Sequence, residues 1–223
     1  MISIIIPVLN EANNILQVLQ PLQKHRGKNI EIVVVDGGSV DNTLELIGPY
    51  SDIVEIAEKG RSSQMNVGAK AACGDIYIFL HADTFLPNDF VECIEKAFSG
   101  SCSSWGRFDI SLSGSALSLR IIEFFINCRS RLTGIATGDQ AIFIRAQVFH
   151  EFGGYQDIPL MEDVAISKTL KQKTPPLCLK DKVLTSSRRW EEFGIWRTVF
   201  LMWQLRLSYF FGVDPHHLVS KYK

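Results

Sequence analysis

The chain has 223 residues, 46% of them hydrophobic and 21% charged, so it can bury a sizeable core and is not expected to be disordered. Its 23 lysines and arginines nearly balance 24 aspartates and glutamates, which argues against nucleic acid as a partner, because nucleic-acid binders carry a clear basic excess. The five cysteines include no C-x-x-C pair, which supports neither a structural zinc site nor a disulfide framework.

The first half of the chain alternates predicted strands with predicted helices. Apolar, β-branched runs at 2–6, 31–35 and 76–80 indicate strands buried on both faces, as in a parallel sheet. Helices are predicted over 13–24 (shortened or kinked by Pro21), around 44–47, over 60–72 and over 89–98, with a short strand at 53–56. This alternation predicts an α/β domain with a mostly parallel central sheet flanked by helices.

The second half is less regular. Apolar residues that alternate with polar ones over 108–112 predict a half-exposed strand, and an apolar helix is expected over 117–125. The remaining predicted elements are a strand at 141–144, a helix at 161–171 and short strands at 177–179 and 183–184. Because no linker or repeat is recognisable, residues 1–187 are predicted to form one domain, and residues 188–223 an amphipathic helical extension.

The C-terminal extension carries large apolar side chains at helical spacing. They are Phe193, Trp196, Phe200, Trp203, Leu207 and Phe210, with arginines beside them. Such a stripe could pack on the domain's own core, contact a membrane surface, or join two copies into a homodimer. No apolar run is long enough for a membrane span and no signal peptide is recognisable. We therefore expect a cytoplasmic protein, with the inner face of the membrane as a candidate location.

Carboxylates follow the predicted strands of the first half. Glu11, Asp36 and Asp83 each come after an apolar run, and one such acid alone would be an ordinary helix cap. Because the carboxyl ends of parallel strands meet at one edge of the sheet, we expect a ligand site there. Asp83 is the best candidate for a divalent cation that holds a diphosphate. His81 lies two residues earlier and could bind the metal, donate a hydrogen bond, or simply end the strand.

Two further motifs suggest an anion site and a base. Arg61 and the free N–H groups at the start of the 60–72 helix favour phosphate, although an ordinary serine-capped helix is the alternative. Glu162 and Asp163 begin the 161–171 helix, where acids are common for electrostatic reasons. Near an anion site, one of this pair could be a general base that accepts a proton from an attacking hydroxyl.

Together these motifs resemble glycosyltransferase family 2, the inverting, nucleotide-sugar-dependent enzymes with the GT-A fold. The matching pieces are Ser3–Pro7, Asn10-Glu11, Val35–Ser39 with Asp41-Asn42-Thr43, Asn66–Gly68, Phe79–Asp83, Gly153–Tyr155 and Glu162-Asp163, in the family's order. The resemblance implies an enzyme that moves a sugar from a nucleoside-diphosphate sugar, UDP- or GDP-linked, to an acceptor hydroxyl. The aromatic stripe adds the expectation that this acceptor is lipid-linked.

The resemblance also implies roles for individual residues. Asp163 would be the catalytic base with Glu162 as a positioning acid beside it, and Asp83 would hold Mn or Mg through the diphosphate. The nucleotide-sugar pocket would involve Pro7, Asn10, Glu11, Asp36, Arg61, Asn66, His81 and Ala82. His81 stands where the family's metal motif usually begins with an acid, so it would either donate a hydrogen bond to the ribose or join the metal shell.

Two other functions are compatible with parts of the sequence. A nucleotidyltransferase can share a similar sheet, but it would favour a glycine-rich basic loop where this chain has Pro7-Val8-Leu9-Asn10-Glu11. A catalytically inactive nucleotide-sugar-binding protein is the other alternative. The presence of both Asp83 and Asp163 argues against that alternative, whereas His81 argues for it.

Overall fold

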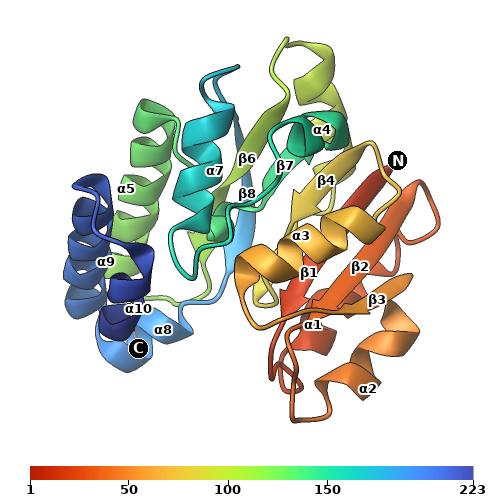
Figure 1. Ribbon diagram of the computed structural model, residues 1–223, viewed down its shortest axis with the longest axis horizontal. Coiled ribbons are helices and arrows are strands. Elements are labelled where there is room, and N and C mark those ends of the chain that lie inside the picture. The colour runs from red at the N-terminus through yellow and green to blue at the C-terminus, as the bar shows by residue number, and fades with distance from the viewer. Residues whose placement is uncertain (223) are drawn as a thin grey trace.

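The computed structural model describes residues 1–222 and is built on a sheet of eight strands (Figure 1). The strands are β1 (Ile2–Val8), β2 (Ile30–Asp36), β3 (Ile53–Ile56), β4 (Ile76–Phe79), β5 (Thr84–Phe85), β6 (Trp105–Leu112), β7 (Ile142–Arg145) and β8 (Leu177–Thr185). The helices are α1 (Ile15–Leu22), α2 (Thr43–Ile47), α3 (Arg61–Ala71), α4 (Phe90–Ser99), α5 (Leu117–Thr133), α6 (Ala146–Glu151), α7 (Glu162–Leu170), α8 (Arg188–Phe193), α9 (Ile195–Phe210) and α10 (Pro215–Tyr222). Short 3-10 turns lie at Gly48–Tyr50 and Gly138–Gln140.

The sheet order is β3-β2-β1-β4-β7-β6-β8-β5. Strands β3, β2, β1 and β4 are parallel neighbours, as the apolar runs predict, and β6 is parallel to β8. Strand β7 is antiparallel to both β4 and β6, and β5 is antiparallel to β8. The predicted α/β domain with a mostly parallel sheet is therefore confirmed, and β1 and β4 end at the same edge.

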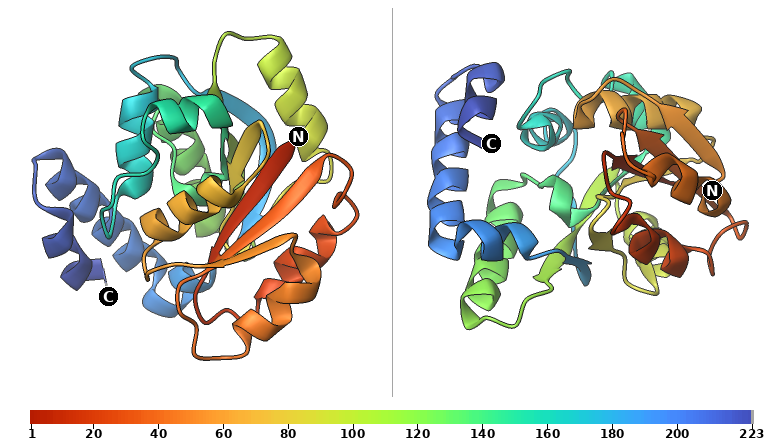
Figure 2. Two further views of the ribbon diagram at one scale, coloured as in Figure 1. Left: turned by 45° about the vertical axis from the view of Figure 1, so that its right-hand side comes forward. Right: turned by 90° about the horizontal axis from the view of Figure 1, so that it is seen from below.

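Helices cover both faces of the sheet (Figures 1 and 2). Ile4 and Ile6 of β1 point to one face and join a core cluster that includes residues of α1, α4 and α5. Ile5, between them, points to the other face and packs with residues of α3, α6 and α7. Successive residues of one strand thus enter opposite cores, which explains why the run is apolar without alternation.

Helix α3 packs unusually closely on the sheet at Gly68. A Cβ added to Gly68 would lie 2.5 Å from Ile5 Cγ2 and 2.9 Å from Val35 Cγ2. These distances leave no room for a side chain. The contact fixes the height of α3 above β1 and β2, and with it the position of Arg61 at the start of the helix.

Several element boundaries differ from the sequence predictions. Helix α1 is shorter than predicted and ends at Leu22, one residue after Pro21, while β8 is one strand where two were expected. Strand β6 is buried along most of its length and not half-exposed, because α5 covers it. The elements β5 and α6 were not predicted, and the predicted helical extension at 188–223 consists of three helices, α8, α9 and α10.

Helix α5 continues to Thr133, well beyond the predicted end at 125, because two of its polar side chains form hydrogen bonds with the backbone of β6. The buried Asn127 side chain accepts a hydrogen bond from the Ile110 N–H at 2.9 Å and donates one to the Ile110 carbonyl at 3.1 Å. The Glu123 carboxylate accepts a hydrogen bond from the Leu112 N–H. These polar residues interrupt the apolar pattern of the helix, yet they satisfy the backbone of β6.

The C-terminal helix α9 packs on the domain through the side opposite the predicted stripe. Thr198 and Leu205 are buried, and Leu205 forms a cluster with Met161, Val164 and Leu218. The six side chains of the stripe are all between 54% and 72% exposed. The prediction that the stripe packs on the domain's own core is therefore wrong.

The division of the chain at residue 187 stays a prediction. No helix within residues 1–222 combines the length and apolar character that crossing a bilayer requires.

We expect Gly68→Val to destabilise the fold by about 1–3 kcal/mol or more, because the new methyl groups must displace Ile5 and Val35 from a packed core. The measurement is the midpoint and slope of urea unfolding. Gly48→Ala is the matched control, since an added Cβ at Gly48 meets nothing within 4 Å. Equal midpoints for the two variants would contradict the close α3–sheet contact.

Candidate active site

A cavity of about 400 Å³ opens at the carboxyl ends of β1 and β4, between the starts of α3 and α7. This volume lies within the range of small-molecule sites, which are roughly 300–1,000 Å³. The side chains that line the cavity are Pro7, Val8, Leu9, Glu11, Lys59, Gly60, Arg61, Gln64, His81, Ala82, Asp83, Pro159, Leu160, Glu162 and Tyr222. The lining mixes acids and bases, so the cavity suits a polar, charged ligand.

Most of the residues predicted for the site meet in this cavity. Seven of them line it, namely Pro7, Glu11, Arg61, His81, Ala82, Asp83 and Glu162. They come from the end of β1, the start of α3, the segment after β4 and the start of α7. Segments far apart in the sequence thus deliver carboxylates and a guanidinium to one place, as the rule for open α/β sheets predicts.

Asp36 ends β2 beside the cavity, without lining it. Its Oδ1 accepts hydrogen bonds from the N–H groups of Gly38 and Ser39, both at 2.7 Å. Its Oδ2 is buried and has no hydrogen-bond partner within residues 1–222. A buried carboxylate oxygen without a partner is costly, so a donor that reached this atom would stabilise it.

Asn10 and Asn66 are occupied by contacts within the fold. Asn10 has a left-handed backbone (φ 54°), and its Oδ1 accepts a hydrogen bond from the Val40 N–H at 2.9 Å. Asn66 forms a pair of hydrogen bonds with the backbone of Tyr155, at 2.8 and 2.9 Å. Both side chains therefore hold loops that border the site. Contact of either one with a nucleotide stays a prediction.

The charges in the cleft are strongly interdependent. Burial raises the pKa of the Asp83 carboxyl, Arg61 opposes this rise, and the charges of Glu11 and Asp139 add to it. For Arg61, burial lowers the pKa, but Glu162, Tyr222, Asp163 and Asp83 together raise it above its ordinary value. Arg61 is therefore close enough to the acids on both sides of the cleft to interact with all of them.

Glu162, which is buried, and Asp163, which is partly buried, form an acidic pair at the start of α7. Burial, and after it the charge of Asp163, raise the pKa of Glu162 from 4.5 to about 7, while Arg61 opposes the rise. Burial also raises the pKa of Asp163, against the effects of Arg206 and of backbone N–H groups. One of these N–H groups belongs to Gly138 and lies 3.0 Å from Asp163 Oδ2, and the other belongs to Val164.

His81 links the two sides of the cleft. A Cβ on Gly138 would lie 2.4 Å from His81 Nε2, so only glycine fits opposite the imidazole. Burial and the nearby Arg61 lower the pKa of His81 to about 3, which keeps the ring neutral near physiological pH. A neutral imidazole can accept or donate a hydrogen bond or bind a metal without first losing a proton. The same Gly138 donates its N–H to Asp163, so the position of His81 and that of Asp163 are connected.

Eight of the fifteen lining residues were not predicted for the site, and Gln64 and Tyr222 are two of them. The Gln64 side chain donates to the carbonyls of Val8 and Val35, both at 2.8 Å, and so joins the ends of β1 and β2. Tyr222 reaches the cavity from α10, and Arg189 lies 3.8 Å from its ring centroid. A buried polar residue on the inner face of α3 could have indicated Gln64. No sequence pattern indicates that α10 returns to the site.

The donor atoms in the cleft fit a hard divalent cation. Mg²⁺ and Mn²⁺ prefer oxygen ligands, and Mg²⁺ is commonly held by one or two carboxylates together with substrate phosphates. Asp83 supplies such a carboxylate, and Glu11 lies close enough to raise its pKa. A separate group of possible metal ligands, Asp89, Cys93 and Asp181, does not line the cavity.

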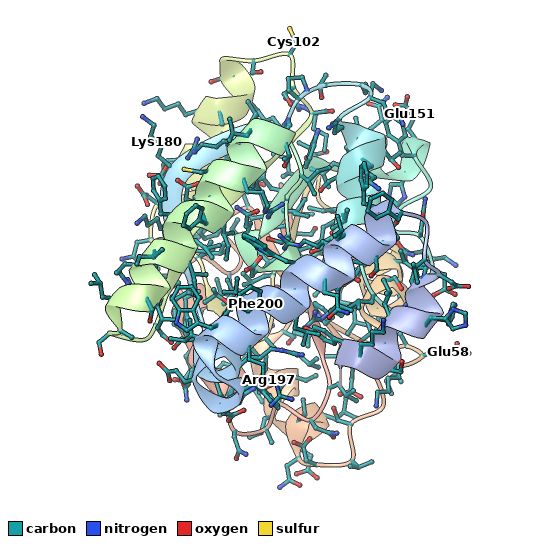
Figure 3. The ribbon with its side chains drawn as sticks, turned by 90° about the vertical axis from the view of Figure 1, so that its left-hand side faces the viewer. Glu58, Cys102, Glu151, Lys180, Arg197 and Phe200 are labelled. Carbon is teal, nitrogen blue, oxygen red and sulfur yellow. The ribbon has the colours of Figure 1, made fainter. Side chains whose placement is uncertain are left out.

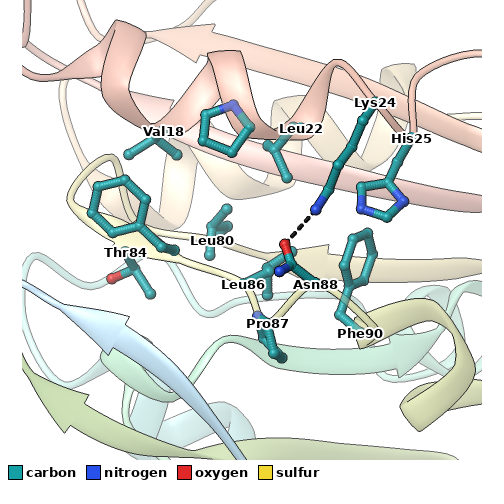
Figure 4. Close-up of a pocket in the computed structure, with 12 residues that line it drawn as sticks. Val18, Leu22, Lys24, His25, Leu80, Thr84, Leu86, Pro87, Asn88 and Phe90 are labelled. Carbon is teal, nitrogen blue, oxygen red and sulfur yellow. Dashed lines mark hydrogen bonds between the residues drawn. The ribbon is translucent and has the colours of Figure 1, made fainter.

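A much smaller cavity lies between α1 and the segment that follows β4 (Figure 4). Its volume is about 20 Å³, and apolar side chains such as Val18, Leu22 and Phe90 form much of its wall. Lys24 donates a hydrogen bond to Asn88 across its mouth. This cavity is too small for a nucleotide, so the large cleft is the candidate active site.

Comparison with known sequences agrees with the geometry. The sequence model for Glycosyl transferase family 2 matches residues 3–146. An uncharacterized glycosyltransferase of Rickettsia felis is 30% identical over 213 residues, which are 87% of this chain and 35% of that protein. The dolichol-phosphate mannosyltransferase of Pyrococcus furiosus is 35% identical over 108 residues, which are 45% of this chain and 31% of that protein. The chain thus spans about a third of the length of these relatives.

Solved structures share the fold. S. aureus TarS 1-349 in complex with UDP superposes with a TM-score of 0.68 at 19% identity, covering 83% of this chain and 60% of that chain. The mannosyltransferase PcManGT from Pyrobaculum calidifontis, in complex with GDP-Man and Mn²⁺, has a TM-score of 0.60 at 18% identity, covering 82% of this chain and 56% of that chain.

We predict that Glu162→Gln stabilises the protein at high pH. Because the pKa of Glu162 rises from 4.5 unfolded to about 7 folded, its contribution to stability is present below pH 4.5 and is lost as pH rises toward 7. The neutral amide removes this loss of stability, which is on the order of 3 kcal/mol. Urea unfolding at about pH 4 and about pH 8 measures the effect. The exposed Glu58→Gln is the control, and a pH-independent difference between Glu162→Gln and wild type would contradict the prediction.

Proposed function

Since the chain belongs to glycosyltransferase family 2, we propose that it transfers a sugar from a nucleoside-diphosphate sugar to an acceptor hydroxyl with inversion at the anomeric carbon. The observation that carries the proposal is the meeting of Asp83, Arg61 and Glu162 in one cavity of about 400 Å³. The cavity combines groups for a diphosphate with Glu162, and Asp163 follows Glu162 in the chain without lining the cavity. Family membership favours sugar transfer over the nucleotidyltransferase alternative.

The nucleotide would occupy the side of the cleft formed by β1, β2 and α3. The free Oδ2 of Asp36 would accept a hydrogen bond from the base, and Pro7 and Glu11 would line the nucleoside. Arg61 would pair with the diphosphate, whose charges would replace the carboxylates that now surround it. Support also comes from relatives of this fold, since the TarS structure holds UDP and the PcManGT structure holds GDP-Man.

Asp83 would hold Mn²⁺ or Mg²⁺ at the diphosphate, with Glu11 nearby and the neutral His81 as a further ligand or hydrogen-bond donor. When bound, such a cation stabilises the negative charge that the leaving nucleoside diphosphate acquires. The Mn²⁺ in the PcManGT complex supports this part of the proposal.

Asp163 would accept the proton of the acceptor hydroxyl, and Glu162 would orient that hydroxyl. The Gly138 and Val164 N–H groups hold the Asp163 carboxylate in place, while burial raises its pKa toward the range in which a base works best. The acceptor oxygen would then attack the face of the sugar opposite the leaving group. Inversion follows from this single displacement, without a covalent enzyme intermediate.

Asp83→Ala is expected to abolish the Mn²⁺-dependent part of nucleoside-diphosphate binding, because it removes the metal carboxylate from the cavity. Isothermal titration calorimetry with UDP and with GDP, each with and without MnCl₂, measures this effect. Asp89→Ala is the matched control, since it removes a carboxylate from the group of possible ligands outside the cavity. If Asp83→Ala bound as wild type and Asp89→Ala did not, the metal assignment would be overturned.

Asp163→Asn is expected to leave that binding intact and to lower turnover by about 10²–10⁴-fold, the usual contribution of a general base. Glu162→Gln should keep more activity. It should also move the acidic limb of the kcat/KM profile to lower pH, because a like charge beside the base is removed. Turnover is measured with a sugar donor, such as UDP-GlcNAc or GDP-mannose, that raises the melting temperature of the protein in a prior screen. If Asp163→Asn kept full turnover and Glu162→Gln had none, Glu162 would be the base and Asp163 the positioning acid.

A further inference from the structure

Helices α5 and α9 lie side by side on one surface of the molecule (Figures 1 and 3). Both helices expose large apolar side chains. On α9 the exposed residues are Trp196, Phe200, Trp203, Leu207 and Phe210, and on α5 they are Leu117, Ile121, Phe124, Phe125 and Leu132. We call this set the aromatic face. Every exposed phenylalanine and tryptophan within residues 1–222 belongs to α5, α8, α9 or the turn after α9.

The two stripes of the aromatic face occupy the outer sides of helices whose inner sides are anchored. Helix α5 buries Leu119 and Ile122 in the main core, and Ile195 and Val199 of α9 pack against that core. Leu205 of α9 packs on α7. The exposed aromatics are therefore not needed to attach these helices. Contiguous apolar surface of this kind on a water-soluble domain marks an interaction site.

The charges around the aromatic face favour an anionic partner. Helix α9 contains no acid, and its Arg197 is exposed, whereas its Arg206 lies toward Asp163. The acid of α5, Glu123, is 5% exposed and paired with Arg120. Arg197 and Phe200 both lie at the surface in Figure 3. On α8, Glu191 and Glu192 are matched by Arg188 and Arg189. The exposed charges along α5 and α9 are thus positive.

We propose that the aromatic face is a docking surface for a lipid bilayer that carries anionic headgroups. Tryptophan and phenylalanine side chains are favoured at the boundary between headgroups and acyl chains, and arginines beside them attract anionic lipids. A second copy of the chain would bring the arginines of two like faces together, whereas an anionic bilayer pairs with them. An anionic bilayer is therefore the partner that complements both the apolar and the charged residues of the aromatic face.

Docking in this way would place the acidic pair near the membrane. Leu205, on the inner side of α9, contacts the cluster containing Met161 and Val164, the residues that flank Glu162 and Asp163. Arg206 is close enough to Asp163 to affect its pKa. In so far as the proposed function holds, an acceptor hydroxyl carried by a lipid would reach the base from the bilayer surface.

Vesicle flotation of the full chain tests the docking proposal without any catalytic readout. We expect the protein to float with vesicles of phosphatidylcholine and phosphatidylglycerol, and less with phosphatidylcholine alone. The triple variant Trp196→Ser, Phe200→Ser, Trp203→Ser should lose at least about tenfold in partitioning, because it removes exposed aromatic groups that the bilayer would bury. Phe124→Ser with Phe125→Ser should reduce partitioning in the same direction.

Val40→Ser with Ile56→Ser is the matched control, since these side chains are 92% and 66% exposed but lie outside the aromatic face. Brominated phosphatidylcholine in the vesicles should quench the fluorescence of Trp196 and Trp203, and the triple variant should lose this quenching. Equal flotation of the triple variant and wild type would overturn the proposal. A dimer in sedimentation equilibrium that the triple variant abolishes, without any flotation of the wild type, would assign the face to a second copy instead.

Discussion

Loss of hydration by the carboxylates of Asp83, Glu162 and Asp163, with Arg61 close to all three, is the constraint on which the active-site cleft depends. Asp83, Glu162 and Asp163 all have raised pKa values because burial removes their hydration. Arg61 lies within electrostatic reach of all three. Such an arrangement is costly without a ligand, and a diphosphate with its cation would supply charges that complement it. The cleft is therefore organised for a charged ligand at the expense of stability.

The position of Arg61 depends on how closely α3 approaches the sheet. Gly68 allows the contact with Ile5 and Val35, and Gln64 ties the same helix to the carbonyls at the ends of β1 and β2. On the other side of the cleft, Gly138 fits against His81 and donates its N–H to Asp163. Glycines at two close contacts thus set the separation between the anion-binding groups and the acidic pair.

The sequence predicted the parts of this arrangement that depend on local pattern. The apolar runs of β1, β2 and β4 identify strands buried on both faces, and the topology of parallel strands then brings Glu11 and Asp83 to one edge. The hydrogen bonds of Gln64, the contact between His81 and Gly138, and the return of Tyr222 to the cavity depend on tertiary pairing, which has no periodicity to detect. Helix α5 was underestimated because Glu123 and Asn127, which are polar in the sequence, are buried against the backbone of β6. The aromatic stripe of α9 was recognised, but amphipathicity alone could not show that this stripe faces outward.

Helix α9 contributes to the aromatic face with its exposed outer side, and its inner side packs on α7, the helix that begins with the acidic pair. The C-terminal segment therefore supports the helix that carries Glu162 and Asp163 and also exposes apolar side chains. In the proposed function, Asp83 and the acidic pair border one metal–diphosphate site. An anomalous-scattering map of crystals grown with MnCl₂ and UDP or GDP tests this arrangement. We expect a manganese peak in the cavity within metal-ligand distance of the Asp83 carboxylate, about 2.0–2.2 Å. Nucleotide bound in the cleft with manganese at Asp89, Cys93 and Asp181, and none at Asp83, would contradict it.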